Sequence, residues 1–157
     1  MSGKPILVGE SNPYGTDQQF ALYPSPDGCS GHRLCCLILG MRRQAYMNVF
    51  ERVNLVDGKW SMKPARERAE KLINGLCGFS EEQPLILLGS KVASAFSVTF
   101  RPFEQLGEDI LMLPHPSGLC RLWGEPGAYA RAREAVLRLA PELADVIGKT
   151  EGKPCRA

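Results

Sequence analysis

The sequence lacks the features that define several large classes of protein. Its 157 residues include only two histidines, and the formal net charge is +2. No apolar run approaches the roughly 20 residues that a membrane-spanning helix needs. A protein that coats a polyanion would be more basic, so any contact with nucleic acid must come from a local face. Length and composition predict one globular domain at 1–148 with a flexible tail at 149–157.

The cysteine spacing gives little support for a metal site. Six cysteines are present, but no CxxC pair occurs, and the adjacent Cys35 and Cys36 cannot clamp one ion in the usual way. We therefore expect no metal and no cofactor, with Cys35, Cys36 and Cys77 packed as small apolar residues. The early apolar stretch 6–8 is too short for a secretion signal, and together with reduced cysteines it indicates a cytoplasmic protein with no membrane partner.

Apolar runs that alternate with helical patterns predict an α/β fold. Strands are expected at 6–8, 53–56, 85–88 and 110–113. Helices are expected at about 30–41 with Ser30 as the cap, 64–76, 90–96 and 126–147 with a break near Pro141. This order predicts a three-layer α/β/α architecture around a central, mainly parallel four-stranded sheet.

The residues with useful chemistry follow the predicted strands. They lie in Glu10–Gly15, at Asn54, in Gly89–Lys91 and in His115–Gly118. Ligands of open α/β sheets bind outside the carboxyl ends of the strands. We therefore expect these four segments to converge on one edge of the sheet.

These segments resemble the motifs of the uracil-DNA glycosylase superfamily. Gly9–Gly15, GESNPYG, is similar to its first motif, G-x-x-P or G-x-D/N-P-x, with one additional residue between Gly9 and Asn12. His115–Trp123, HPSGLCRLW, closely resembles its last motif, HPS followed by a DNA-penetrating loop. Further similar segments are Tyr23–Pro26 for the Pro-rich loop, Val53–Leu55 for the base-reading strand and Leu87–Ser90 for the Gly-Ser phosphate loop.

The resemblance covers about residues 6–137 and implies a uracil-DNA glycosylase-like fold and a monofunctional DNA glycosylase. Such an enzyme acts as a monomer on duplex or single-stranded DNA, flips a pyrimidine nucleotide and hydrolyses its N-glycosidic bond to leave an abasic site. The excised base is uracil-type or a modified pyrimidine such as glucosylated hydroxymethylcytosine in phage DNA. The biological role is then DNA repair or antiviral defence, and both remain open.

The resemblance also implies catalytic roles. His115 would donate a hydrogen bond to the departing base, which carries negative charge in the transition state. Asn12 would orient the attacking water through its side-chain carbonyl, although an amide is not a base. Glu10 is the rival residue for handling this water.

Other residues would recognise the flipped base. Asn54 offers both a donor and an acceptor to its Watson–Crick edge. Phe20 or Tyr23 would stack against the ring. Tyr14 occupies the place where branches strict for uracil have an aromatic that excludes a 5-substituent.

The remaining predicted contacts are with DNA. Ser90, Ser117 and nearby backbone N–H groups would bind phosphates, with charge from Lys91 and Arg121. Leu119 would act as a wedge that fills the vacated stack. Ser11 and Gly118 complete the predicted DNA-binding set.

Two other classes of function compete with this interpretation. A non-catalytic reader would flip and hold a modified base, and Asn12 in place of a carboxylate keeps that alternative open. A nucleotide-processing α/β enzyme would carry a Gly-rich phosphate fingerprint, but the sequence has neither GxGxxG nor a Walker loop.

Overall fold

A mainly parallel β-sheet forms the centre of the protein. The computed structural model describes residues 3–11, 15, 17–76 and 78–150. Its strands are β1 (Ile6–Ser11), β2 (Glu51–Val56), β3 (Leu85–Leu88), β4 (Gln105–Leu106) and β5 (Ile110–Leu113). The strand order is β2-β1-β3-β5-β4, and all neighbours pair in parallel except β4 and β5.

The predicted α/β class and mainly parallel sheet are confirmed, but the predicted strand number is wrong. Among the described residues the sheet has five strands, because β4 adds an antiparallel edge. This strand has two residues, and both Gln105 and Leu106 are exposed. Such a short exposed strand has no apolar periodicity, so the sequence carries no signal for it.

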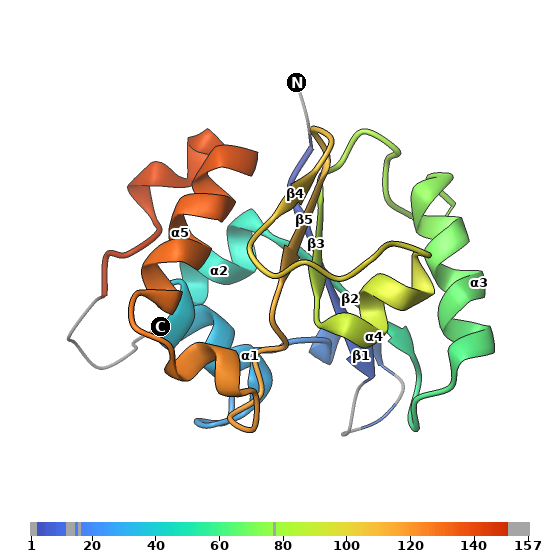
Figure 1. Cartoon of the computed structure of the whole chain (residues 1–157), viewed down its shortest axis with the longest axis horizontal. Helices are drawn as coiled ribbons and strands as arrows, with labels where there is room; N and C mark the ends of the chain where they lie inside the picture. Colours follow the sequence, from blue (N-terminus) through green and yellow to red (C-terminus); the bar gives the residue numbers. More distant parts are fainter. Residues whose placement is uncertain (1–2, 12–14, 16, 77, 151–157) are drawn as a thin grey trace.

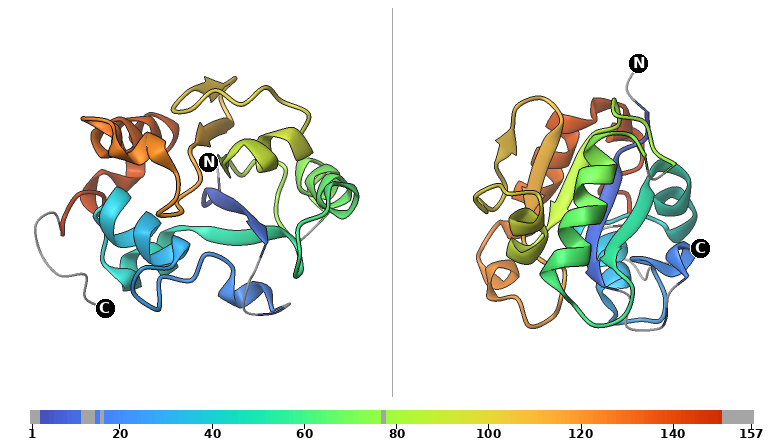
Figure 2. Two further views of the ribbon diagram at one scale, coloured as in Figure 1. Left: turned by 60° about the horizontal axis from the view of Figure 1, so that its bottom comes forward. Right: turned by 90° about the vertical axis from the view of Figure 1, so that its right-hand side faces the viewer.

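Helices cover both faces of the sheet (Figures 1 and 2). One face packs against η2 (Arg33–Ile38), α2 (Arg43–Val49) and α5 (Ala128–Leu139), and the other against α3 (Met62–Ile73) and α4 (Ser90–Ala95). Alternate residues of β1 divide between the two cores, with Leu7 in the first and Ile6 and Val8 in the second. A strand buried on both faces must be apolar throughout, as the predicted strands are.

The first helical region differs from the expected α-helix. It consists of the short α1 (Ser30–His32) followed by the π-helical η2, and Cys29 rather than Ser30 is the N-cap. The Cys29 Sγ accepts from the His32 N–H at 3.4 Å. At the other end, Arg133 donates to the carbonyl oxygens of Leu37 and Ile38 at 3.2 and 2.8 Å. These bonds satisfy carbonyls that a helix end leaves unpaired.

One of two further helical regions was not predicted, and the other agrees with the prediction. Helix α2 was not predicted because only Tyr46 among its residues is buried, which leaves no apolar stripe. The predicted break at Pro141 is confirmed, since α5 ends at Leu139 and the 3-10 segment η4 (Pro141–Asp145) follows. The chain remains packed through Thr150, which is 6% exposed.

Cys36 corrects one expectation about the cysteines. It is buried, but it is disulfide-bonded rather than only a small apolar side chain. Cys35 is buried and free, as expected. Cys77 and residues 151–157 lie outside the described residues. In the part of the chain that the structure describes, no helix has the length and apolar character needed to cross a membrane.

Candidate functional site

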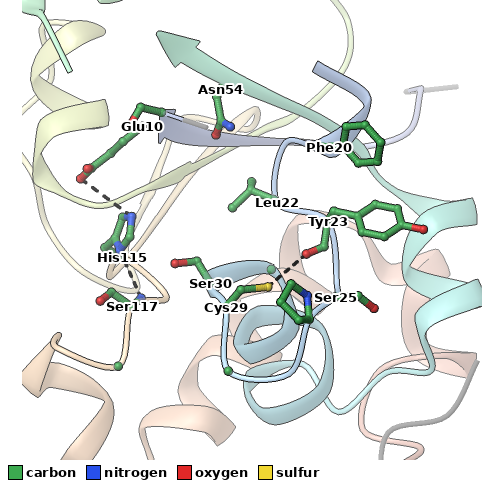
Figure 3. Close-up of a pocket in the computed structure, with 15 residues that line it drawn as sticks. Glu10, Phe20, Leu22, Tyr23, Ser25, Cys29, Ser30, Asn54, His115 and Ser117 are labelled. Carbon is green, nitrogen blue, oxygen red and sulfur yellow. Dashed lines mark hydrogen bonds and ion pairs between the residues drawn. The ribbon is translucent and has the colours of Figure 1, made fainter. Parts of the chain in front are cut away.

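A cavity of about 690 Å³ lies at the carboxyl edge of the sheet. One wall carries Glu10 from β1, Asn54 from β2 and His115 from the segment after β5, while the facing wall comes from residues 20–31 (Figure 3). The parallel strands all end at this edge, which brings together side chains far apart in the sequence. The predicted site residues that line the cavity are Glu10, Ser11, Phe20, Tyr23, Asn54, His115, Ser117 and Gly118.

His115 has a defined hydrogen-bonding state. Its Nδ1 accepts from the Ser117 N–H at 3.1 Å. An imidazole that accepts at Nδ1 carries its proton on Nε2 when neutral, so Nε2 is a donor. Nε2 lies 4.0 Å from Oε1 of Glu10, which is longer than a direct hydrogen bond. Both groups therefore remain able to bind a substrate or a water molecule.

Burial keeps this imidazole neutral. Desolvation lowers the pKa of His115 below its ordinary value, the Glu10 carboxylate opposes this shift, and the Lys91 ammonium adds to it. A neutral donor beside a developing anion stabilises it without a full charge in the ground state.

The backbone around His115 is held from two sides. The Trp123 indole Nε1–H donates to the His115 carbonyl at 2.7 Å, and the Arg33 Nε–H donates to the Pro116 carbonyl at 3.1 Å. Trp123 is 6% exposed, which agrees with a packing role for it rather than a DNA wedge. Arg33 carries no sequence signal for this role, because its contact with Pro116 spans 83 positions.

Gly89 explains how Glu10 and His115 approach each other. It precedes α4 with φ +99°, a conformation that other residues rarely adopt. A Cβ at this position would lie 3.1 Å from the His115 Cβ and 3.6 Å from Oε1 of Glu10. The absence of a side chain therefore leaves room for both groups.

Asn54 is the buried amide of the site. The residue is 3% exposed, its backbone N–H donates to Oε1 of Gln18 at 2.9 Å, and its carbonyl accepts from Arg68 at 3.0 Å. Its side-chain amide makes no hydrogen bond to residues 3–11, 15, 17–76 or 78–150. Because this amide lines the cavity, both its donor and its acceptor can bind a polar group of a ligand. Gly9 pairs with Asn54 in the sheet, and a Cβ there would overlap the Asn54 Oδ1.

The aromatic residues lie at the outer part of the cavity. Phe20 and Tyr23 are 48% and 38% exposed and pack edge to face with ring centroids 5.7 Å apart. Figure 3 shows the Tyr23 ring directed away from His115, with Leu22 between them. Leu22 has φ +50°, which is uncommon for leucine and directs its side chain to the cavity. Sequence reasoning missed Leu22, since an isolated apolar loop residue carries no signal.

Small residues form the wall that faces Glu10 and His115. It includes Ser25, Gly28, Cys29, Ser30 and Gly31. The Cys29 thiol is free, half-buried and bonded to the Tyr23 carbonyl at 3.4 Å. The only sequence signal for this wall was the Pro-rich segment 23–28.

The other predicted residues fall outside the cavity lining. Ser90, Lys91 and Arg121 are exposed, and Leu119 is 93% exposed. Ser117 Oγ accepts from the Leu119 N–H at 3.1 Å, which shapes the loop that presents this leucine. Asn12 and Tyr14 lie outside the described residues.

The cavity therefore combines a neutral donor, a carboxylate and a buried amide. Within the described chain, no group of three or more His, Cys, Asp and Glu residues could hold a metal ion. Comparison of the chain with protein-family models and with curated proteins finds no significant match.

Proposed function

We propose that this protein is a monofunctional DNA glycosylase with a uracil-DNA glycosylase-like fold. It flips a pyrimidine nucleotide into the cavity and hydrolyses the N-glycosidic bond, leaving an abasic site. The motif resemblance of Gly9–Gly15 and His115–Trp123 supports this proposal, as does the convergence of Glu10, Asn54 and His115 at one edge of a parallel sheet.

The single observation that carries the proposal is the state of His115. Its Nδ1 accepts from Ser117, and burial lowers its pKa, which supports a neutral imidazole with a proton on Nε2 at the cavity. When the glycosidic bond breaks, its electron pair passes to the base, and an oxygen of that base becomes anionic. The Nε2–H stabilises this oxygen more strongly in the transition state than in the ground state.

A carboxylate would serve the other half of the reaction. Glu10 lies within the cavity, 4.0 Å from His115. It would stabilise the oxocarbenium-like sugar and accept a proton from water as the water oxygen bonds to C1′. The proton ultimately replaces the sugar on the released base. The family pattern gives the water-orienting role to Asn12, so Glu10 and Asn12 are the two candidates for this step.

Asn54 would read the base. Its side-chain amide lines the cavity and makes no hydrogen bond to the described residues. It can donate to one group of a pyrimidine edge while accepting from the next. Phe20 or Tyr23 would stack on the ring. Ser11, Ser90, Lys91, Ser117, Gly118 and Arg121 would contact DNA, and Leu119 would enter the vacated stack.

The cavity size bears on the choice of base. A pyrimidine occupies ~120 Å³, the volume of four water molecules in the liquid. The cavity of about 690 Å³ has room for more than this ring, and small residues line its far wall. Uracil-type bases and bulkier modified pyrimidines are therefore both candidate substrates, in repair or in antiviral defence.

A non-catalytic reader of a flipped modified base is the second candidate. Asn12 favours it, because an amide stands where some branches of the family have a carboxylate. A reader would bind the modified DNA through the same cavity but release no base.

Excision assays on defined duplexes test the proposal and separate these candidates. Each duplex carries one uracil or modified pyrimidine, and alkali then cleaves any abasic site. We expect cleavage at one class of base, with loss of at least a hundredfold in rate for His115→Ala. Glu10→Gln should slow cleavage if Glu10 handles the water. Its control is Glu134→Gln, on the exposed face of α5, which should retain full activity. Tight binding without strand cleavage on any base would instead support the reader.

A further inference from the structure

Arg33 is a cation fixed beside the loop that carries His115. It begins η2, and its Nε–H donates to the Pro116 carbonyl at 3.1 Å. A Cβ added at Gly118 would lie 3.7 Å from both Cζ and Nη1 of Arg33 and 3.8 Å from its Nε. These nearly equal distances indicate that the guanidinium presents its flat side to Gly118.

Most of the guanidinium's donors remain available. Nη1 and Nη2 make no hydrogen bond or ion pair within the described part of the chain. Other arginines differ, since Arg43 pairs with Asp27 and Arg68 pairs with Asp57. Arg33 is also only partly exposed, so less side-chain entropy is lost when it binds a ligand.

A second donor lies in the same loop. The Ser117 Oγ accepts from the Leu119 N–H, which leaves its own hydroxyl proton to donate outward. Ser117 and Gly118 also line the cavity. The Ser117 hydroxyl therefore lies at the cavity, and the Arg33 guanidinium lies against the neighbouring residues Pro116 and Gly118.

We propose that Arg33 binds a phosphodiester adjoining the extruded nucleotide, together with Ser117. Planar guanidinium groups bind phosphate oxygens through paired charge-assisted hydrogen bonds. Because the same side chain holds Pro116, phosphate binding and the position of His115 are linked through one residue. This inference rests on the proposed function only in requiring that DNA enters this cavity.

The dependence of DNA affinity on salt tests this inference without knowledge of the target base. A duplex with one abasic-site analogue serves as the probe, because it offers an extrudable nucleotide that carries no base. For the intact protein, log K is measured against log salt concentration. Each phosphate contact contributes about 0.9 to the slope on B-DNA. We expect Arg33→Gln to reduce the slope by about this amount. Arg138→Gln, an exposed substitution on α5, should leave it unchanged.

Glutamine is informative because its Nε2 occupies the same position along the side chain as the arginine Nε. It can keep the bond to Pro116 while it removes the charge, so the variant should fold with an unchanged melting temperature. Arg33→Lys restores the charge and should restore the slope. A wild-type slope in Arg33→Gln, with DNA still bound, would overturn this inference alone. Failure of the wild-type protein to bind DNA would overturn both this inference and the proposed function.

Discussion

Substitution of Gly9 by alanine isolates the contribution of the Asn54 amide. Gly9 pairs with Asn54 between β1 and β2, and its φ lies outside the positive region that only glycine adopts readily. The backbone therefore accepts alanine. The new Cβ would come closer to the Asn54 Oδ1 than real Cβ atoms do and would lie 3.3 Å from the Leu22 side chain. The amide must move.

The size of the effect follows from this displacement. Relief of the overlap requires a shift of about 1 Å, and a misplacement of that size can reduce catalysis by about a hundredfold. This corresponds to about 2.7 kcal/mol of transition-state stabilisation. The free energy of unfolding falls by less than this. Overpacking destabilises the folded state by typically about 1–3 kcal/mol, whereas alanine restricts the unfolded chain and so stabilises the protein by about 0.4–1 kcal/mol.

Single-turnover excision by four proteins measures this coupling: wild type, Gly9→Ala, Asn54→Ala and the double variant. If the clash acts through the amide, Gly9→Ala slows the wild-type protein about a hundredfold but has little further effect on Asn54→Ala. Gly124→Ala is the matched control, because a Cβ there meets nothing within 4 Å. Equal losses in both backgrounds would refute the reasoning, and so would full activity of Gly9→Ala.

Three further predictions concern other parts of the site. Excision should persist as pH falls below the ordinary histidine pKa of about 6.5 and then decline as His115 is protonated. The Lys91 charge lowers the pKa of His115, so Lys91→Gln should raise it. In a pH–rate profile at saturating DNA, the decline should therefore move to higher pH. Leu119→Ala should reduce the excision rate on duplex DNA much more than on a single strand, and the ratio of the two rates measures this difference. Equal losses on both substrates would mean that Leu119 supports the loop structure and does not act as a wedge. Iodoacetamide should inactivate the protein by alkylating Cys29 in the cavity wall, and Cys29→Ser should stay active after treatment; equal inactivation of both would place the sensitive thiol elsewhere.

Features that depend on periodicity were predictable from the sequence. The buried strands β3 and β5 are uniformly apolar and were predicted with their correct bounds. The edge strand β4 and helix α2 were missed because each has few or no buried residues. The π-helical η2 was also unpredictable, because the Arg133 bonds that support its end come from a residue 95 positions away.

The candidate site, like the fold, was predictable only in part. Glu10, Asn54 and His115 could be predicted to converge because parallel strands end at one edge, and they do line one cavity. The opposing wall could not be predicted, since Leu22 and Cys29 enter it through loop conformation rather than pattern. Gly89 belongs to the segment that resembles a phosphate loop, but its close approach to His115 depends on how two strands pack.

Direct detection of a released base tests the central claim. A duplex carrying the base that the protein binds most tightly is incubated with wild type, Glu10→Gln and His115→Ala, and the free base and abasic DNA are quantified by mass spectrometry. We expect equal amounts of free base and abasic sites from the wild-type protein. We expect at least a hundredfold slower release by His115→Ala, with DNA binding retained. Wild-type protein that binds this DNA yet releases no base, or a folded His115→Ala that releases it at the wild-type rate, would contradict the account.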